Sequence, residues 1–424
     1  MFLVKIYVFI ALHILILLNF SKFKKTTSIF VNYYAFGHSI ADVCNYFTAN
    51  PRYSLCISIG NKRERNYEFK HLLSNYNLIH FRLPTLPESK NINLRKIVGP
   101  ITINQLNSNT LLSRLNKNKI QCTEFTRTID KATSKNLSST FSISKQRSDE
   151  IISLAKRLYL KNENSNGVST QLYWQLNNLI ELTYHKKFTR FEDMYLARIK
   201  RLANGLDVKI CTLIVRQDNY HKPHHGIGLG GYTEIIELLS ANNFIINLIG
   251  DIDFANHKSK FDSKKVKTLT SLDYNFNSKL FQLIAIKNSS FCLGDPSGAQ
   301  ALVGLFNKKN LIFNNIPVGQ FHSNSLILPR VWRDQNGKKA TKEIIANELF
   351  YRIYPWVDKT GNTFTPHKNS KETLIKVTQK FLDCYENKNK IIPSKAFQDF
   401  AKNSPLFEFA LSSDIASQYF EQMD

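Results

Sequence analysis

The stretch that decides the fold is residues 289–317, which read SSFCLGDPSGAQALVGLFNKKNLIFNNIP. An apolar run at 289–293 indicates a short strand, and five small, polar or turn-forming residues at 294–298 end it. Residues 299–306 then indicate a helix, and residues 310–313 indicate a second strand. Two strands joined through a helix lie parallel in one sheet. The stretch therefore predicts an α/β fold with a parallel sheet.

The segments before this stretch repeat the same order of strand and helix. Residues 208–215, VKICTLIV, indicate a buried strand, and residues 232–239 have helical spacing. Residues 244–249, FIINLI, indicate a second buried strand, and a helix is predicted at 280–286. We therefore predict a carboxyl-terminal α/β domain over residues 205–345.

The amino-terminal half shows a similar alternation of elements. The predicted elements are strands at 27–34, 53–59 and 78–83 and helices at 40–47, 67–76 and 172–202. Such alternation favours a parallel sheet with helices on both faces. Residues 26–204 are therefore predicted to form a first α/β domain. The mostly helical pattern of residues 346–424 predicts helices that pack back on the cleft between the domains.

The amino-terminal segment contains a nearly continuous apolar run from Ile6 to Phe20. No small-residue cleavage site follows the run, which leads instead into Lys22, Lys24 and Lys25. We expect residues 1–25 to form a membrane anchor, with the domains that follow on the cytoplasmic side, because positive charge favours that side. A helix lying in the membrane interface and a buried core helix are the alternatives.

Composition and charge narrow the class of protein. The chain has 424 residues, of which 43% are hydrophobic and 12% aromatic, as in folded proteins. Its formal charge of +24 favours anionic ligands or an anionic membrane face. The lysines are scattered and no nucleic-acid-binding motif accompanies them, so we expect no nucleic-acid partner. The six cysteines lie far apart without a C-x-x-C pair, which indicates free, mostly buried thiols in a reducing compartment.

Polar and turn-forming clusters follow the predicted strands. They are Gly37-His38-Ser39, Arg216-Gln217-Asp218, Gly250-Asp251 and the turn at residues 294–298. In open α/β sheets, ligands bind outside the carboxyl ends of the strands. The coincidence of four clusters with predicted strand ends indicates a binding site at that edge.

Two of these clusters have the chemistry of a phosphate site. Arg216 comes directly after a strand, where a guanidinium can bind a phosphate pair through two hydrogen bonds. A salt bridge to Asp218 is the alternative for this residue. Ser297 and Gly298 open a predicted helix, so their N–H groups and the hydroxyl can donate to an anion. Ser297 can equally serve as a helix cap, and both roles can hold together.

The other polar residues have less specific patterns. His38 can act as a general base toward a hydroxyl, or be an ordinary, partly exposed loop residue. Asp251 and Asp253 have the D-x-D form that binds a cation in some transferases, although Asp251 also fits a strand end. We expect no metal site and no cofactor.

The loop of residues 221–231, HKPHHGIGLGG, has two motif-like features. His221, His224 and His225 form a dense cluster, but a Gly-rich loop offers no fixed ligand geometry, so a loop that closes over substrate is favoured over a metal site. Gly226, Gly228 and Gly231 match the spacing G-x-G-x-x-G on paper. The loop begins well after the strand and passes through Pro223, which argues against a dinucleotide turn.

Several of these segments resemble a known family. VRQDNY at 215–220, GYTEIIELLSANNFIINLIGD at 231–251, the stretch at 289–317 and FGHSIAD at 36–42 resemble a bacterial family of glycosyltransferases of the GT-B type. The resemblance implies two Rossmann-like domains that face each other across a cleft, an amino-terminal anchor helix and carboxyl-terminal helices. The layout is also distantly similar to fucosyltransferases, although Gln217 stands where they have a second basic residue.

The resemblance assigns roles to individual residues. It implies that Arg216, Ser297 and Gly298 bind the donor diphosphate and that His38 faces the acceptor. Weaker substrate contacts are implied for Gly37, Asp218, Asp251 and Asp295, although Asp295 is also expected to shape its turn together with Pro296.

The function that follows is a membrane-associated transferase at the inner membrane, with its catalytic domains in the cytoplasm. It would move a sugar from a nucleotide-sugar donor to a glycan or lipid-linked acceptor without a metal. A non-catalytic anchored protein that binds a nucleotide or glycan is one alternative. Another transferase on the same scaffold, such as a pyruvyl transferase, is the second.

Overall fold

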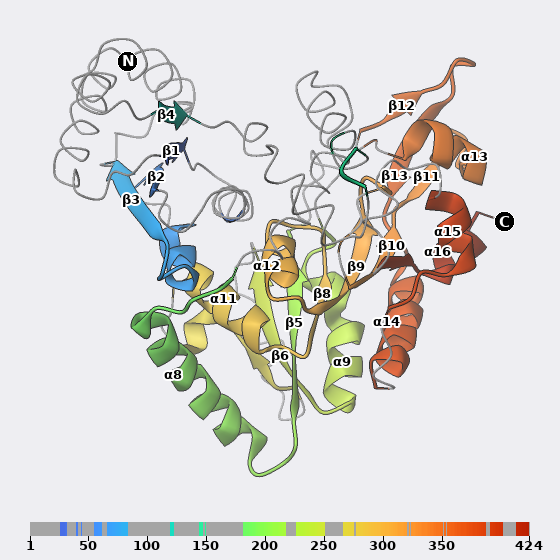
Figure 1. Cartoon of the computed structure of the whole chain (residues 1–424). Coiled ribbons are helices and arrows are strands. Elements are labelled where there is room, and N and C mark those ends of the chain that lie inside the picture. The colour runs from blue at the N-terminus through green and yellow to red at the C-terminus, as the bar shows by residue number, and fades with distance from the viewer. Residues whose placement is uncertain are drawn as a thin grey trace. The chain divides into compact units, whose positions relative to one another are not determined.

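The structure is a computed structural model of the chain (Figure 1). It describes residues 26–31, 40, 44, 55–61, 66–83, 119–122, 144–146, 149, 181–217, 226–250, 266–274, 277–319, 322, 324–350, 352, 354–386, 391–401 and 413–423. Contacts divide the chain into two compact units: the first comprises residues 1–136 and 179–191, and the second comprises residues 137–178 and 192–424. One of the boundaries falls inside α8 (Lys186–Ala203), between Phe191 and Glu192. Each unit has its own parallel sheet.

The first unit contains four described strands, all paired in parallel in the order β3-β2-β1-β4. Their bounds are Thr26–Val31 for β1, Leu55–Asn61 for β2, Asn77–Leu83 for β3 and Lys119–Cys122 for β4. The strands predicted at 27–34, 53–59 and 78–83 are confirmed with small shifts at their ends.

The helix predicted at 67–76 is shorter and tighter than expected. It is the 3-10 helix η2, Asn66–Leu72. Its end is set by a long-range backbone contact: Thr183 N–H donates to the Leu72 carbonyl at 2.9 Å, and Ser74 N–H donates to the Thr183 carbonyl at 2.9 Å. Because these groups pair with residue 183, they cannot continue a helix, and the chain turns into β3 instead.

The second unit contains seven described strands, all parallel, in the order β14-β10-β9-β8-β5-β6-β7 (Figure 1). Their bounds are Lys209–Val215 for β5, Phe244–Gly250 for β6, Thr268–Leu269 for β7, Phe291–Gly294 for β8, Lys309–Asn315 for β9, Ser325–Pro329 for β10 and Ser413–Ile415 for β14. The strands predicted at 208–215, 244–249, 289–293 and 310–313 are therefore confirmed, as is the parallel α/β class.

The strand order reverses between β5 and β8. From β5 the chain continues outward to β6 and β7, and it then returns to β8 and continues in the opposite direction to β9 and β10. The helical connections that follow the adjacent strands β5 and β8 therefore lie on opposite faces of the sheet. In open parallel sheets a crevice for ligands forms at this position, outside the carboxyl ends of the two strands.

Helices cover both faces of this sheet. α9 (Thr233–Ala241) and α14 (Lys371–Glu386) pack on one face, where the alternate residues Cys211, Leu213 and Val215 of β5 belong to the main hydrophobic core. α11 (Ser278–Asn288) covers the opposite face, beside the short α12 (Gln300–Leu305) (Figure 1). The period-two pattern of a strand buried on both faces explains why β5 is apolar almost throughout.

A buried polar chain fixes α8 and α11 against the second face. The Asn247 amide of β6 donates to Tyr195 Oη of α8 at 2.9 Å and to Thr212 Oγ1 of β5 at 3.3 Å. Thr212 Oγ1 in turn lies 2.6 Å from Ser289 Oγ, which donates to the Ala285 carbonyl of α11 at 2.8 Å. Polar groups this deeply buried are stable only when paired, so the chain of bonds holds these elements in one arrangement.

The carboxyl-terminal tail contains strands as well as the expected helices. α13 (Lys342–Ile344) and a π-helix (Ile345–Leu349) precede β12 (Trp356–Val357) and β13 (Thr363–His367), which form a small antiparallel sheet with β11 (Val331–Arg333). After α14 come α15 (Lys395–Ala401), β14 and α16 (Ser417–Glu421). Because β14 pairs with β10, the end of the chain completes an edge of the main sheet.

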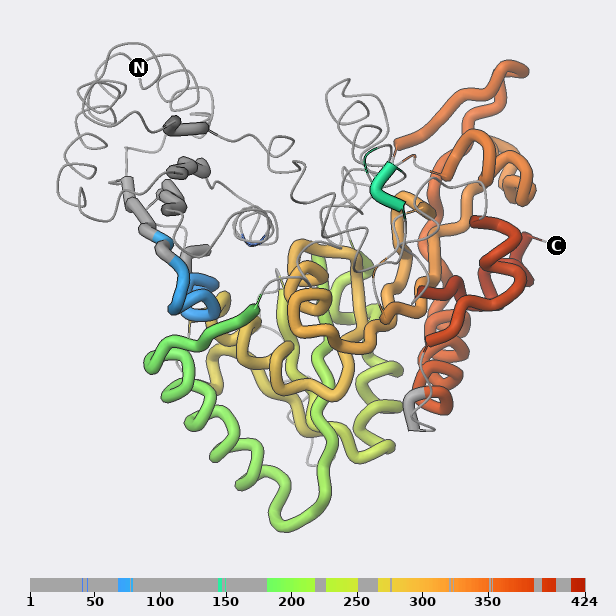
Figure 2. Tube along the Cα trace, in the orientation of Figure 1, coloured from blue at the N-terminus to red at the C-terminus, as the bar shows by residue number. Residues whose placement is uncertain are grey.

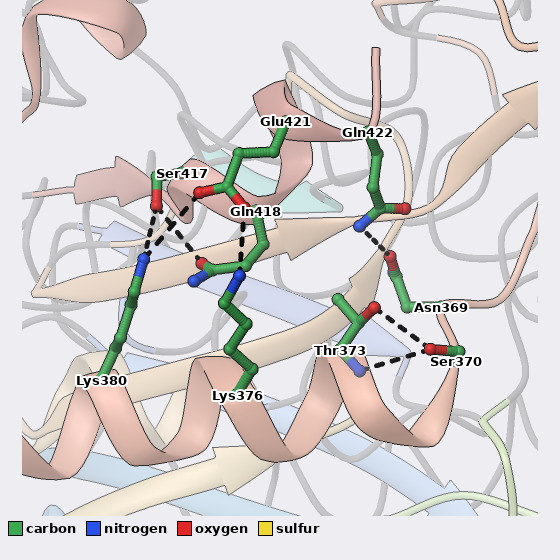
Figure 3. Close-up of polar contacts among 9 residues, drawn as sticks. All are labelled: Asn369, Ser370, Thr373, Lys376, Lys380, Ser417, Gln418, Glu421 and Gln422. Carbon is green, nitrogen blue, oxygen red and sulfur yellow. Dashed lines mark hydrogen bonds and ion pairs between the residues drawn. The ribbon is translucent and has the colours of Figure 1, made fainter. Parts of the chain in front are cut away.

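α14 and α16 lie side by side at that edge (Figure 2). Figure 3 shows Lys376 and Lys380 of α14 facing α16, with Lys376 Nζ 3.3 Å from Glu421 Oε2 and Lys380 Nζ 3.0 Å from Ser417 Oγ. Gln422 Nε2 donates to Asn369 Oδ1 at 3.2 Å, just before α14 begins. These contacts are on the surface, so apolar packing beneath them must supply most of the binding between the two helices.

Within the described ranges, no helix combines the length and apolar character that crossing a membrane requires. The anchor expected at residues 1–25 lies outside those ranges. Of the described cysteines, all free, Cys44, Cys211 and Cys292 are buried and Cys384 is exposed, in line with the expectation of mostly buried thiols.

We predict that Phe381→Ala destabilises the protein by about 3–5 kcal/mol. Phe381 of α14 is 3% exposed, and its ring meets Phe291 of β8 edge-on at 5.3 Å between centroids. The control is Glu421→Ala, which removes only surface ion pairs and should cost less than about 1 kcal/mol. Urea unfolding of both variants measures the difference, and equal losses would contradict this account of the carboxyl-terminal edge.

Candidate functional site

The structure brings two of the predicted clusters together at the switch point of the second sheet. Arg216 directly follows β5, and residues 295–298 directly follow β8, the strand beside it. Arg216, Ser297 and Gly298 are all half-buried. Because the two strands are parallel neighbours, the clusters meet at the same edge of the sheet, as the sequence pattern predicted.

Asp295 is the central side chain of this site. It is completely buried, and both of its carboxylate oxygens accept hydrogen bonds. Oδ2 accepts the backbone N–H of Arg216 at 3.0 Å, and Oδ1 accepts the hydroxyl of Tyr232 at 2.7 Å. Tyr232 is itself fully buried and lies directly before α9. One carboxylate therefore joins the end of β5, the start of α9 and the turn after β8.

Gly294 allows this close approach of β8 to β5. Its φ is +132°, a conformation that side-chain-bearing residues rarely adopt, and a Cβ at this position would overlap the carbonyl oxygen of Ile214. The next N–H, that of Asp295, donates to the same carbonyl at 2.8 Å. A glycine here thus lets the turn fold directly over the neighbouring strand.

Gly226 provides the space for the Asp295 carboxylate. A Cβ on Gly226 would overlap Asp295 Oδ2, so only hydrogen fits at this position. Two residues later, Gly228 N–H donates to the Arg216 carbonyl at 3.0 Å. Two of the three glycines that resembled a dinucleotide fingerprint, Gly226 and Gly228, therefore pack against Asp295 and Arg216, and the 3-10 helix η5 (Leu229–Tyr232) follows them.

Ser297 and Gly298 form a turn ahead of α12. The Ala299 N–H donates to Ser297 Oγ at 3.2 Å, and the Gln300 N–H donates to the Ser297 carbonyl at 3.0 Å. The helix begins at Gln300, one residue later than predicted. Since Ser297 Oγ accepts a bond, it caps the turn, and its hydroxyl proton can be donated to a ligand.

Gln300 holds this turn from beneath. Its side-chain amide donates to the Asp295 carbonyl at 3.2 Å, and its Oε1 accepts from Asn310 Nδ2 of β9 at 2.6 Å. Both side chains are buried. The turn is therefore tied to two neighbouring strands and presents its exposed side in a fixed geometry.

The sequence pattern did not identify two buried polar residues at this edge of the sheet, Tyr232 and Arg330. Tyr232 was interpreted only as the start of a helix, and Arg330 was not assigned a role. Arg330 directly follows β10 and is 3% exposed. The sequence carried a signal for it, because the apolar run at 325–329 ends in a basic residue, the pattern that had identified Arg216.

The charge state of Asp295 reflects its surroundings. Burial raises the pKa of this carboxyl to about 6, while the Arg216 N–H, the Tyr232 hydroxyl and the charges of Arg330 and Arg216 oppose the rise. Because this folded-state value lies above the unfolded one, the proton contributes stability below about pH 4 that is lost as the pH rises through about 6. Near neutral pH, Asp295 is thus a buried carboxylate surrounded by donors.

Several predicted site residues lie outside the described part of the chain. They are Gly37, His38, Asp218, Asp251 and the histidines at 221, 224 and 225. Their roles stay predictions. Among the described residues, no group of three or more His, Cys, Asp or Glu side chains could hold a metal ion.

Comparisons with known proteins give only distant likenesses. No protein-family model and no curated protein matches the chain. A family 9 glycosyltransferase from Veillonella parvula has a TM-score of 0.46 and 10% identity, covering 85% of this chain and 98% of that one. The ADP-heptose heptosyltransferase II of E. coli has a TM-score of 0.39 and 9% identity, covering 71% and 89%.

A UDP-GlcNAc 2-epimerase from Methanocaldococcus jannaschii has a TM-score of 0.37 and 13% identity, covering 84% of this chain and 99% of that one. These three are not fucosyltransferases, and that expected likeness is not shown. At such low scores and identities, the likenesses carry no argument about activity. The function has to be argued from the residues of the site.

We predict that Tyr232→Phe destabilises the protein by about 1–3 kcal/mol, because Asp295 Oδ1 loses its donor while buried. The matched control is Tyr419→Phe. Tyr419 is buried like Tyr232, with 1% exposed against 0%, but its hydroxyl has no hydrogen-bond partner among the described residues. Its removal should leave the free energy of unfolding unchanged or slightly raised. Chemical denaturation of both variants decides the point, and similar losses would argue against a special role for Tyr232.

We also predict that Gly226→Ala costs about 1–3 kcal/mol, because the added methyl displaces Asp295. Gly230→Ala is the control, since a Cβ there meets nothing within 4 Å. It should change stability by less than about 0.5 kcal/mol. Thermal unfolding compares the two, and a harmless Gly226→Ala would show that the loop does not need this close contact.

Proposed function

We propose that this protein is a glycosyltransferase that uses a nucleotide-sugar donor. The observation that supports the proposal is the position of Arg216 and the Ser297–Gly298 turn, which follow adjacent parallel strands where the strand order reverses. A guanidinium, a hydroxyl and turn N–H groups are the donors that a diphosphate needs. No observation favours the two alternatives, a non-catalytic binding protein and another transferase on the same scaffold, over a glycosyltransferase.

The proposed reaction needs charge stabilisation at the diphosphate and a base at the acceptor. The acceptor hydroxyl oxygen forms a bond to the anomeric carbon, and the bond from that carbon to the diphosphate oxygen breaks. Arg216 and the turn at Ser297 stabilise the negative charge that develops on the leaving diphosphate. The acceptor proton passes to a base, for which His38 is the candidate.

The donors named here need no metal ion to hold the diphosphate, and metal independence is part of the proposal. We place the protein at the inner membrane, with the catalytic domains in the cytoplasm, on the strength of the apolar run and the lysines in residues 1–25. A glycan or lipid-linked acceptor would fit that location. Acceptor and location are proposals that rest on the sequence alone.

The test is a thermal-shift and turnover screen of the whole chain against ADP, GDP, UDP and their sugar conjugates. A ligand at about 100 times its Kd should stabilise the protein by about 2.7 kcal/mol. With the responding donor, Arg216→Ala should lower kcat/KM by about 100-fold or more, because a charged contact to the leaving group is lost. Ser297→Ala should lower it by about tenfold.

Arg333→Ala is the control for loss of a positive charge. Arg333 donates to the Gly337 carbonyl at 2.9 Å within a surface turn, and its removal should leave turnover unchanged. Binding of a nucleotide sugar without hydrolysis or transfer would favour a binding protein instead. Neither binding nor turnover across the panel would refute the proposed function.

A further inference from the structure

The small antiparallel sheet of the second unit begins at the edge of the main sheet where the proposed donor site lies. β10 ends at Pro329 and β11 begins at Val331, so the sheet β11-β13-β12 starts where the main sheet ends. Figure 1 shows β12 and β13 (orange) beyond the upper ends of β9 and β10. Because the strands of the main sheet are parallel, this is also the edge at which β5 and β8 end.

The outer strand of this small sheet carries uncovered apolar side chains. Among the described residues, β12 pairs only with β13. Tyr354 is 52% exposed and Val357 is 58% exposed. Between them lies the half-buried Trp356, whose ring stacks on Phe364 at 6.1 Å and lies 5.1 Å from the Arg352 guanidinium. Large apolar side chains that gather at the surface mark a site of interaction.

Two turns bring lysines to the end of the same sheet. Because β11 and β12 each run antiparallel to β13, the turns at 334–338 and 358–362 lie at one end. Gln335 joins them: its Oε1 accepts the Thr363 N–H at 2.6 Å, and its Nε2 donates to Asn362 Oδ1 at 3.1 Å. The exposed lysines in or beside the two turns are Lys338, Lys339 and Lys359.

The acids of the two turns bond to their own backbone and form no ion pair with these lysines. Asp334 Oδ1 accepts the N–H groups of Asn336 at 2.9 Å and Lys338 at 2.8 Å. Asp358 Oδ1 accepts the N–H groups of Thr360 and Asn362, both at 2.8 Å. The aspartates therefore hold the turns in shape, and the exposed ammonium groups give this end a positive charge.

We propose that the end of the small sheet formed by Tyr354, Val357, Lys338, Lys339 and Lys359, here called the docking edge, binds the surface of an anionic lipid bilayer. Apolar side chains that enter the boundary between headgroups and acyl chains, together with lysines that attract anionic headgroups, are what such binding requires. Tyrosine suits this boundary because its ring is apolar and its hydroxyl can stay in contact with water.

Other macromolecules fit the docking edge less well. A nucleic acid would contact the lysines, but its phosphate backbone offers nothing to the uncovered Val357. A stable protein interface takes about 20–30 residues a side, far more than the few side chains that this edge presents. A bilayer needs only a few inserted side chains, because the lipids rearrange around them and charge supplies the rest of the attraction.

Docking at this edge would bring the proposed donor site close to a lipid-linked acceptor. That consequence rests on the proposed function. The contact with the bilayer does not rest on it, because it depends only on the exposure and charge of the docking edge, and it does not depend on residues 1–25.

The first experiment compares Val357→Trp with Leu206→Trp in the whole chain. Leu206 is the matched control, since it is 65% exposed and lies just before β5, at the opposite edge of the main sheet. The vesicles contain phosphatidylglycerol and phosphatidylcholine, with or without bromine on the acyl chains to quench tryptophan. Relative to the wild-type chain, the added Trp at 357 should lose emission on brominated vesicles, and the Trp at 206 should keep it. Tyr354→Trp provides a second probe of the docking edge.

Equal quenching at positions 357 and 206, or quenching at neither, overturns the proposal. A membrane anchor in residues 1–25 would not change this reading. It would hold both variants on the vesicles alike, whereas the bromines quench only a tryptophan that reaches the acyl chains.

The second experiment removes the charge of the docking edge in the Val357→Trp chain. Lys338→Gln, Lys339→Gln and Lys359→Gln are combined, and the control combines Lys186→Gln, Lys200→Gln and Lys395→Gln, which are exposed lysines elsewhere. Each lysine near an anionic membrane contributes about fivefold in binding, so the three together contribute about 100-fold. Quenching at 357 should therefore be largely lost in the first combination and kept in the control.

Retained quenching without the three lysines, or equal loss in both combinations, overturns the role of the docking edge. So does equal quenching on brominated vesicles of phosphatidylcholine alone, because the proposal requires anionic lipid. Neither experiment contains a nucleotide. Failure of docking therefore leaves the proposed function to its own test, and failure of the donor screen leaves the docking edge to this one.

Discussion

The buried carboxylate of Asp295 is the contact on which the geometry of the second unit's site depends. It accepts the Arg216 N–H and the Tyr232 hydroxyl, so it joins three segments that are distant in sequence: the end of β5, the start of α9 and the turn after β8. A buried charge is tolerated only when donors and counter-charges surround it. The site therefore forms only when the end of β5 and the start of α9 bring their donors to the carboxylate in the turn after β8.

The strand order of the second sheet brings the segments of this site together. β5 and β8 are neighbours in space although helices and two strands separate them in the chain, because the strand order reverses between them. Gly294 and Gly226 then remove the side chains that would keep the turn and the loop apart. Close packing at these two glycines thus allows the buried Asp295 carboxylate to reach its donors.

The parts of the fold that were predictable are those with long apolar runs. β5, β6 and β9 are seven residues each, and their apolar runs between turn residues were visible in the sequence. β7, β12 and β14 have two or three residues, too few to show a period, and they exist because a neighbouring strand pairs with them. For the same reason η2 ends early, since residue 183 pairs with its last turn.

The sequence by itself determined the parallel α/β class and the location of Arg216 and the Ser297–Gly298 turn at strand ends, because strand length, apolar content and turn residues are local properties. The tertiary structure alone decided which strand ends are neighbours and that the buried Asp295 carboxylate accepts hydrogen bonds from Arg216 and Tyr232. Pairing and burial depend on contacts between residues far apart in the chain, and no local pattern records those contacts.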